Sequence, residues 1–562
     1  MKNQTKLWGF IGLGFWFAIN TIQAALTLLS HDEAYYWMYS RYLDWGYFDH
    51  PPAIAVAIKI GYFFIQSELG VRIISVILST LTIYLLLKIC NPEKVQVKLF
   101  FLIVFSIPLV HAGGFLATPD VPFIFFTTCF FYVYKSYIED YSWKKAILLA
   151  LVMSLLLYSK YHGALVIFFT IISNINILTK KTFWVAGVLA LILFLPHLIW
   201  QLNHDFPSIK YHLFERSRGV FKIDYVLEYI GGQFLILGPL SGIVLFVASL
   251  KNKDTSLFTR TLKFTLIGFF LFFLLNSFKS RVEANWTSAA FIPLIILSFY
   301  TLKENTLLRK WMINLAVPVI ILIIAARVVL MLEELPLNIK AKSEFHLWDK
   351  WANQIKEKAE GAPVVFMNSY QKASKYTYYT GEFAYSLNNF MYRKNQYDIW
   401  PFEDSLQGKK VFIIPNYPTQ ADSFRTAIGE KYNFRFIENF RSYNKVKIKV
   451  LNEKEIVDIP EDTVTLSIEL KNIGSYTADF TSNPELPSNL CVNIYHKGIY
   501  QSTQLYPLKT SVIKPNEKFE QEIKFITRKE EGDYNFRVAI FTGWLPYGLN
   551  SDLNELKVKK AL

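Results

Sequence analysis

Residues 7–29 read LWGFIGLGFWFAINTIQAALTLL, and no charged side chain interrupts this run. Such a run is typical of a helix that crosses a bilayer, because about 20 apolar residues span the hydrocarbon core. A cleavable signal peptide has a shorter apolar core that ends in a small-residue cleavage site. Here Ile22, Gln23, Ala24 and Ala25 lead into further apolar sequence. We therefore expect an uncleaved first membrane helix.

Further apolar runs follow as far as residue 332, and they predict a polytopic α-helical membrane protein. With the first run they make about eleven transmembrane helices: 7–29, 71–89, 99–114, 121–136, 145–159, 163–178, 183–201, 224–250, 262–278, 287–302 and 311–332. The pair 145–159 and 163–178 is short for two crossings. Residues 1–332 are thus expected to form one transmembrane domain.

The net charge of +14 lies largely in short loops between the apolar runs. With a cytoplasmic N-terminus, alternate loops are rich in lysine, as at Lys94, Lys98, Lys180 and Lys181, and the loops between them are poorer. This asymmetry follows the positive-inside rule and predicts that the C-terminal part is extracytoplasmic. No basic cluster with interleaved aromatic residues suggests nucleic-acid binding, and three scattered cysteines suggest neither a disulfide framework nor a zinc site.

Charged and polar residues predominate after residue 332. Residues 333–454 combine a helical stretch, WDKWANQIKEKAE, with short strands such as KKVFIIP, which predicts a small α/β domain. Residues 455–562 alternate apolar and polar positions in runs such as TVTLSIEL and YNFRVAIF. Turn residues separate these runs, so we expect a terminal antiparallel β-sandwich with an accessory role.

The strongest local signal is HDEAYYW at 31–37, directly after the first apolar run. Two adjacent acids at the end of a membrane helix are unfavourable against lipid, so Asp32 and Glu33 are expected to face water or a protein cavity. There a carboxylate can act as a general base on an acceptor hydroxyl. The structural alternative is a helix cap.

Two further acidic motifs precede apolar helices. The segment YFDHPP places Asp49 and His50 before two prolines, and ATPDVP places Asp120 at a helix start. Both patterns are also those of an ordinary capped helix N-terminus. The functional interpretation is that the two acids and His50 line the same cavity, with His50 as a phosphate or metal contact.

Cationic side chains are predicted on the same outer side of the membrane. A phosphate leaving group needs positive charge that stabilises the departing oxygen. The alternative is contact with lipid headgroups. The candidates are Lys160, His162, Lys210, His212, Arg216, Arg218, Lys279 and Arg281.

No glycine-rich nucleotide loop is present. A site on the extracytoplasmic side has no access to cytoplasmic nucleotide sugars in any case. An activated lipid is therefore the expected sugar donor.

The motifs together resemble a known group of enzymes. DEAYYWMYSRYLDWGYFDHPP, ATPD, LLLYSKYHG, LPHLIWQLNHDFP and VEANWTSAAF occur in the same order as in the GT-C glycosyltransferases related to protein O-mannosyltransferases and, more narrowly, to bacterial lipid A aminoarabinose transferases. The resemblance covers roughly residues 1–332 and extends into NSYQKASKYTYYTGE and YRKNQYDIW. It leaves out the predicted sandwich.

The resemblance implies roles for individual residues. Asp32 matches the catalytic base, with Glu33 and Asp120 as further catalytic acids. Asp49 and Lys160 match family positions implied in binding the donor phosphate or sugar, whereas relatives typically carry lysine where His50 stands. From their predicted place on the outer side, His50, His162, Arg216, Arg218, Lys279 and Arg281 are expected to bind the donor phosphate or sugar as well. The implied cavity-lining residues are Tyr35, Glu283, Asn285, Trp286, Tyr370 and Arg393. Some relatives bind a divalent metal, but no ligand set in this sequence compels one.

The resulting expectation is an inverting glycosyltransferase of the bacterial inner membrane. It would move a hexosyl or pentosyl group from a polyprenyl-phosphate donor to an extracytoplasmic lipid A, glycan or protein acceptor. Two other classes fit parts of the pattern: a carrier or flippase for a lipid-linked sugar, and a glycan-binding membrane protein. Neither has an evident need for the outward acid pair.

Overall fold

The computed structural model describes residues 2–215, 221–333, 344–390, 392–417, 421–452, 456–458, 463–527 and 530–558. Predicted site residues Arg216 and Arg218 lie outside these ranges. The chain divides into two compact units, Met1–His346 and Leu347–Leu562.

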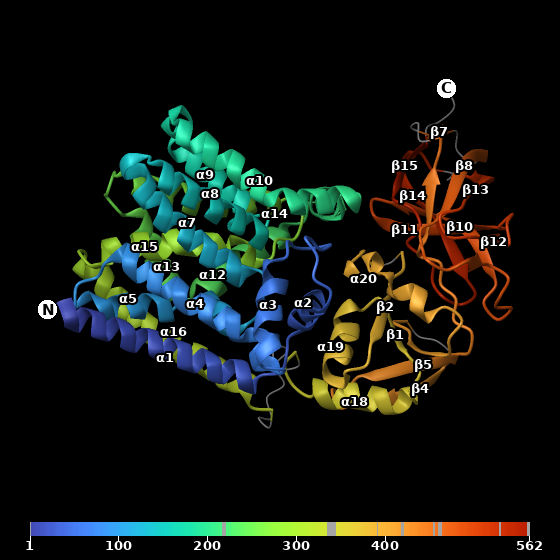
Figure 1. The fold of residues 1–562 in the computed structure, drawn as a ribbon, viewed down its shortest axis with the longest axis horizontal. Helices are drawn as coiled ribbons and strands as arrows, with labels where there is room; N and C mark the ends of the chain where they lie inside the picture. Colours follow the sequence, from blue (N-terminus) through green and yellow to red (C-terminus); the bar gives the residue numbers. More distant parts are fainter. Residues whose placement is uncertain are drawn as a thin grey trace. The chain divides into compact units, whose positions relative to one another are not determined.

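The first unit is helical (Figure 1). Within the described residues, seven helices are long and apolar enough to cross a membrane. They are α1 (Lys2–Leu26), α4 (Glu68–Cys90), α7 (Asp120–Asp140), α10 (Lys181–Asn203), α14 (Leu257–Ser277), η3 (Ala284–Ala290) continued by α15 (Phe291–Leu302), and α16 (Thr306–Met331).

Two bent helix pairs raise the number of candidate spans to nine if each pair is one span. α5 (Gln96–Phe105) and α6 (Pro108–Phe115) meet at 78°, and α12 (Ile223–Leu237) and α13 (Ser241–Leu250) meet at 95°. Pro108 starts α6, and its ring cannot continue the preceding helix. Gly238 follows α12 with φ +104°, a conformation that ends the helix and that side chains disfavour.

The predicted polytopic α-helical architecture is confirmed, but the count of eleven spans is not. Two of the predicted crossings, 145–159 and 163–178, correspond to α8 (Trp143–Ser159) and to α9 (Gly163–Ser173) with η1 (Ile175–Thr179). α9 has only 11 residues, about half of what a crossing needs. The orientation in the membrane stays a prediction.

The outward faces of the long helices are apolar. On α16, Ile321 and Leu322 are 61% and 60% exposed, and on α10 Leu191 and Ile192 are 57% and 58% exposed. In water such continuous apolar surface would be unfavourable, whereas lipid tails are a suitable solvent for it. The packing inside is tight, and almost every side chain of α15 is buried. Figure 1 shows α15 among α5, α7 and α13.

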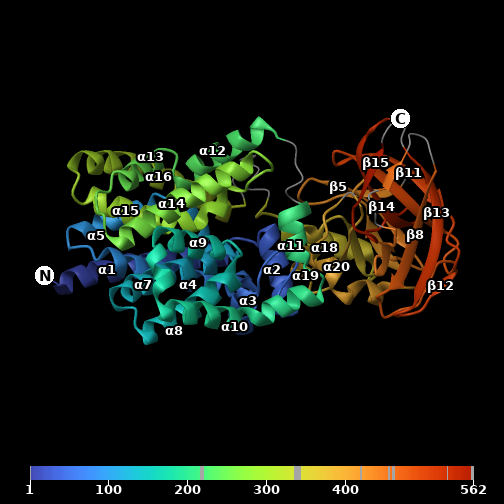
Figure 2. The same ribbon diagram turned by 90° about the horizontal axis from the view of Figure 1, so that it is seen from above.

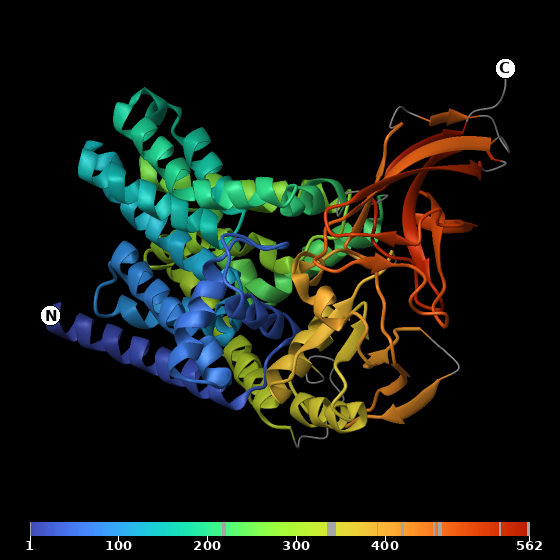
Figure 3. The same cartoon turned by 45° about the vertical axis from the view of Figure 1, so that its right-hand side comes forward.

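The second unit begins with an α/β part, drawn from yellow to orange in Figure 3. Its five-stranded sheet has the order β2-β1-β3-β5-β4. The strands are β1 (Val364–Met367), β2 (Ala384–Leu387), β3 (Val411–Ile414), β4 (Asp422–Arg425) and β5 (Lys431–Ile437). β1 pairs in parallel with β2 and β3, while β5 is antiparallel to its neighbours. α18 (Trp348–Ala359) buries Trp348, Trp351, Ala352, Ile355 and Ala359, the spacing of one helix face.

A β-sandwich completes the unit (Figure 2). The sequence predicts an antiparallel sandwich from residue 455, but the pair formed by Asn554–Val558 and Ile456–Asp458 is parallel, and the sandwich already includes Val446–Val450. One layer has the order β13-β8-β6 and the other β11-β10-β14-β15-β7. Alternate residues of β8, Val464, Leu466, Ile468 and Leu470, enter the core between the layers. The strands are β6 (Val446–Val450), β7 (Ile456–Asp458), β8 (Thr463–Asn472), β10 (Ser488–His496), β11 (Ile499–Tyr506), β13 (Lys518–Ile526), β14 (Gly532–Thr542) and β15 (Asn554–Val558), with β9 (Ala478–Asp479) and β12 (Val512–Ile513) forming a small ladder.

Candidate active site

The acid pair that follows α1 begins α2 (His31–Arg41). Ser30 caps this helix: its hydroxyl accepts from the Glu33 backbone N–H at 3.2 Å, and the Glu33 carboxylate accepts from the Ser30 N–H at 2.9 Å. This reciprocal arrangement is a capping box, which fixes the first turn. Glu33 therefore takes part in a helix cap, the structural alternative predicted from the sequence.

Glu33 also forms a buried ion pair with Arg72 of α4. Arg72 Nε and Nη2 donate to the two carboxylate oxygens at 2.6 and 2.7 Å, and both side chains are fully buried. Burial alone would raise the pKa of Glu33, but the Arg72 charge and the surrounding hydrogen bonds outweigh it, so this pKa lies below its ordinary value. Glu33 is thus an ionised structural anchor.

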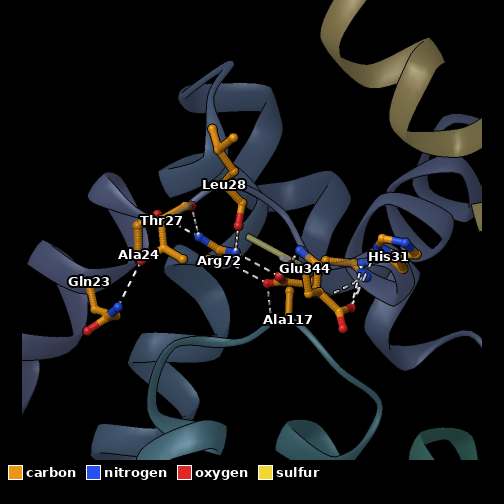
Figure 4. A network of polar contacts seen from close by, with 10 residues as sticks. Gln23, Ala24, Thr27, Leu28, His31, Arg72, Ala117 and Glu344 are labelled. Atoms are coloured by element: carbon orange, nitrogen blue, oxygen red, sulfur yellow. Dashed lines mark hydrogen bonds and ion pairs between the residues drawn. The ribbon is translucent and has the colours of Figure 1, made fainter. Parts of the chain in front are cut away.

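Arg72 joins several segments at this point (Figure 4). Its guanidinium donates to the carbonyls of Ala24, Thr27 and Leu28, where α1 ends. Glu33 in turn accepts from the Ala117 N–H at 2.9 Å. The pair therefore fixes the corner between α1 and α2 to the segment that leads into Asp120.

Asp32 differs from its neighbour because its side chain is exposed. It lies in the first turn of α2, one residue before the Glu33 anchor. A carboxylate on a rigid helix start and open to the surroundings is available to a reacting group.

Asp120 lies at the start of α7 in a second buried cluster. Lys160, which directly follows α8, donates to Asp120 Oδ1 at 2.8 Å. Ser288 donates to the same oxygen and Asn285 to Oδ2, each at 2.7 Å. Asp120 and Lys160 are 7% and 5% exposed. Three segments that are far apart in sequence thus meet at one carboxylate.

The connection between α2 and α3 (Ala53–Phe64) carries Asp49 and His50. Tyr39 donates to Asp49 Oδ2 at 3.3 Å, and His212 of η2 (Lys210–Glu215) donates to the Asp49 carbonyl at 3.1 Å. Asp49 is 6% exposed. These contacts place the connection against the segment that follows α10.

His50 links the connection to the Asp120 cluster. Burial lowers its pKa to about 3, with Asp49, Lys160, His212 and Asp120 all close enough for their charges to act on it. The imidazole is therefore neutral near pH 7. Its Nδ1 is buried, and among the described residues it has no hydrogen-bond partner. A buried unpaired nitrogen is unfavourable unless a ligand or water engages it.

An aromatic group borders the Asp120 cluster. The His162 ring lies 5.5 Å from that of Trp286 and 5.0 Å from that of Phe273. Trp286 belongs to η3, the same turn that presents Asn285, and half-buried Glu283 directly precedes this turn. The motif VEANW therefore lies beside the Asp120 cluster.

Other predicted cations lie on the surface. Lys210 pairs with Asp205, Arg281 pairs with Glu228 in an exposed contact, and Lys279 is exposed. The structure does not describe Arg216 and Arg218.

Three predicted cavity residues are engaged in packing. Tyr35 is 2% exposed and lies 4.7 Å from the Tyr39 ring. In the second unit, Arg393 donates to the Tyr370 hydroxyl at 2.7 Å and lies over its ring. These two residues thus form a pair with each other.

Arg72 and Ser288 are the site residues that sequence reasoning missed. Arg72 lies at the start of the predicted span 71–89, whose other charge is Lys88 at the opposite end, and an ionisable residue in an apolar run is itself a signal. Arg327 of α16 carries the same signal and binds Gln23 and His111 within the first unit. In the described part of the chain, no three His, Cys, Asp or Glu side chains are grouped to hold a metal ion.

Comparison with known proteins gives the following likenesses. Residues 49–200 match the model of the dolichyl-phosphate-mannose-protein mannosyltransferase family. Lipid A galacturonosyltransferase RgtD of Rhizobium johnstonii is 23% identical over 300 residues, which are 48% of this chain, and the chain spans only 60% of that relative's length.

Two solved structures share the fold. ArnT from Cupriavidus metallidurans in the apo state aligns with a TM-score of 0.56 and 13% identity, over 77% of this chain and 97% of ArnT. The same protein bound to undecaprenyl phosphate aligns with a TM-score of 0.53 and 12% identity, over 76% and 97%.

The matched segment contains much of the candidate site. Asp49, His50, Asp120 and Lys160 all lie between residues 49 and 200. Asp32 and Glu33 precede it, and Glu33 is joined to it through Arg72 and Ala117. The family match thus covers residues 49–200, and the likeness to ArnT shows a shared fold.

Proposed function

We propose that the protein transfers a sugar from a polyprenyl-phosphate carrier to an acceptor on the extracytoplasmic side of a bacterial inner membrane. The observation that carries this proposal is the joining of the Asp32–Glu33 helix start to the Asp120–Lys160 cluster. Glu33 accepts from Ala117, and Asp120 follows three residues later. The exposed Asp32 and the buried Asp120–Lys160 cluster thus belong to segments that this hydrogen bond joins.

The related proteins support the class of donor. The name of the matched family includes dolichyl-phosphate-mannose, and one ArnT structure contains undecaprenyl phosphate. Both are polyprenyl phosphates. For this chain we infer a donor in which the sugar is joined to such a phosphate through its anomeric carbon.

The proposed reaction is a single displacement with inversion. Asp32 removes the proton from an acceptor hydroxyl, whose oxygen forms a bond to the anomeric carbon. The bond from this carbon to the phosphate oxygen breaks, and the lipid phosphate leaves with the electron pair. The proton ends on the Asp32 carboxylate and is then lost to water.

The second cluster is proposed to receive the phosphate. The Lys160 ammonium has three N–H donors, and one is bound to Asp120. Neutral His50 can offer a further ring nitrogen, because Nδ1 has no partner among the described residues. Asp120, held by Lys160, Asn285 and Ser288, serves to orient the Lys160 ammonium. Preorganised donors of this kind stabilise the charge that develops on a leaving oxygen.

The acceptor is proposed to be a glycan, a lipid such as lipid A, or a protein. Lipid A is included among these acceptors because it appears in the name of the Rhizobium relative. The choice between a hexose and a pentose rests on the pocket that encloses the sugar ring.

A donor panel tests the proposed function. The full-length protein in nanodiscs is incubated with undecaprenyl-phosphate-linked mannose, galactose, galacturonic acid and aminoarabinose, together with a mixed membrane extract as acceptor source. We expect release of free undecaprenyl phosphate from at least one donor, dependent on acceptor. Movement of an intact lipid-linked sugar between leaflets, with no release of lipid phosphate, would instead indicate a flippase.

A further inference from the structure

The sandwich of the second unit has a face that its core does not use. In β10 the core side chains are Leu490, Val492 and Ile494. Alternate residues of a strand point to opposite sides, so Cys491, Asn493 and Tyr495 belong to the other face. We call this face, on the five-stranded layer whose strands are labelled in Figure 1, the outer face.

Strand register defines two rows of side chains on the outer face. Asn493 lies opposite Thr503 of β11 and Arg537 of β14. Tyr495 lies opposite Tyr500 of β11 and Asn535 of β14. Tyr495 and Arg537 are therefore diagonal neighbours across two paired strands, a separation that long side chains can bridge.

Aromatic rings gather at the same place. Phe390 from the α/β part lies 5.6 Å from Tyr500, 6.3 Å from Tyr495 and 5.0 Å from Tyr547. The Phe390 N–H donates to the Tyr547 carbonyl at 3.0 Å, which fixes this segment against the face. Tyr500 is 41% exposed, and the other three rings are partly exposed. They form an aromatic surface that solvent still reaches.

Two polar atoms beside these rings are unsatisfied. The Tyr495 hydroxyl and Arg537 Nε are buried, and within the described residues neither has a hydrogen-bond partner. Nearby Asn493 is different, because it accepts from the Thr503 hydroxyl. A buried polar atom without a partner is unfavourable, so these two positions are suited to an added partner.

We propose that the outer face binds a glycan chain, with a sugar ring against Tyr500 and its hydroxyls on Tyr495 and Arg537. A pyranose has an apolar C–H side and a hydroxyl edge. The aromatic ring of Tyr500 is suited to the apolar C–H side. The Tyr495 hydroxyl, which both donates and accepts, and the Arg537 N–H beside it are suited to the hydroxyl edge. Small-ligand sites have this composition of aromatic lining with few fixed polar groups. None of these residues takes part in the proposed transfer reaction.

Binding is tested on the full-length Asp32→Asn protein in nanodiscs, so that transfer chemistry does not consume the ligand. The probes are linear hexasaccharides of glucose, galactose, mannose and N-acetylglucosamine, followed by saturation-transfer NMR and calorimetry. We expect at least one to bind, with Tyr500→Ala and Tyr495→Phe each weakening binding by about tenfold or more. The exposed residue Ile499 of the same strand provides a matched control, and Ile499→Ala should bind within about twofold of the parent.

A second measurement separates ligand contact from stability. Because the Tyr495 hydroxyl has no partner in the described structure, Tyr495→Phe should leave thermal stability unchanged while reducing binding. The proposal is overturned if no hexasaccharide binds at millimolar concentration, or if the two tyrosine variants bind like Ile499→Ala. Either result leaves the transfer reaction untouched, since its residues lie in the other unit.

Discussion

Asp32→Asn is expected to lose sugar transfer by about 10²–10⁴-fold while the protein still folds and inserts into the membrane. The amide keeps the size of the side chain but cannot remove a proton from the acceptor hydroxyl. Since Asp32 is exposed and the helix start is held by Ser30, Glu33 and Arg72, the substitution leaves the anchor intact. Acceptor-dependent release of undecaprenyl phosphate gives the rate, and size-exclusion chromatography reports folding.

Asp224→Asn is the matched control, because Asp224 is also an exposed acid in the first turn of a helix, α12. It should retain the parent rate. If Asp32→Asn were as active as this control, another group would have to take the proton and the assignment of the base would be wrong.

Arg72→Met is expected to give the largest loss of stability. The substitution leaves the Glu33 carboxylate buried without its cation and removes the donor to three carbonyls at the end of α1. Breaking a buried ion pair from one side typically costs about 3–5 kcal/mol. Thermal unfolding in detergent, or the yield of folded protein where it is too unstable to purify, measures the effect.

Two variants sharpen that experiment. Lys145→Met removes the cation of a more exposed pair with Asp140 and should change stability little. The double variant Glu33→Gln/Arg72→Met should regain part of the loss, because no uncompensated charge then remains. An Arg72→Met protein as stable as Lys145→Met would show that the pair does not hold the corner between α1 and α2.

Much of the fold follows from local sequence patterns. An apolar run such as 311–332 contains its own evidence for a membrane helix, and TVTLSIEL shows the alternation that β8 uses. The number of spans is less accessible, because the sequence does not give the size of a bend such as the 78° between α5 and α6. A continuous apolar run has the same sequence pattern whether its helix crosses the membrane straight or bends and turns back.

Part of the candidate site could also be predicted from local sequence motifs. Motif reasoning named Asp120, Lys160 and Asn285, which the structure brings together. The resemblance named Asp32 as the base and Glu33 as a further catalytic acid, but the sequence could not show that Glu33 forms a buried ion pair, because its partner Arg72 lies far away along the chain. Nor could it tell that Arg281 would pair with Glu228 at the surface.

The most direct test of the account is a cryo-EM structure of the Asp32→Asn protein in nanodiscs with an undecaprenyl-phosphate sugar that the panel identifies as donor. The account predicts that the phosphate lies within hydrogen-bonding distance of Lys160 or His50, and that the sugar lies between this phosphate and residue 32. A lipid phosphate bound away from these side chains, or a sugar that residue 32 cannot reach, would contradict the proposed reaction.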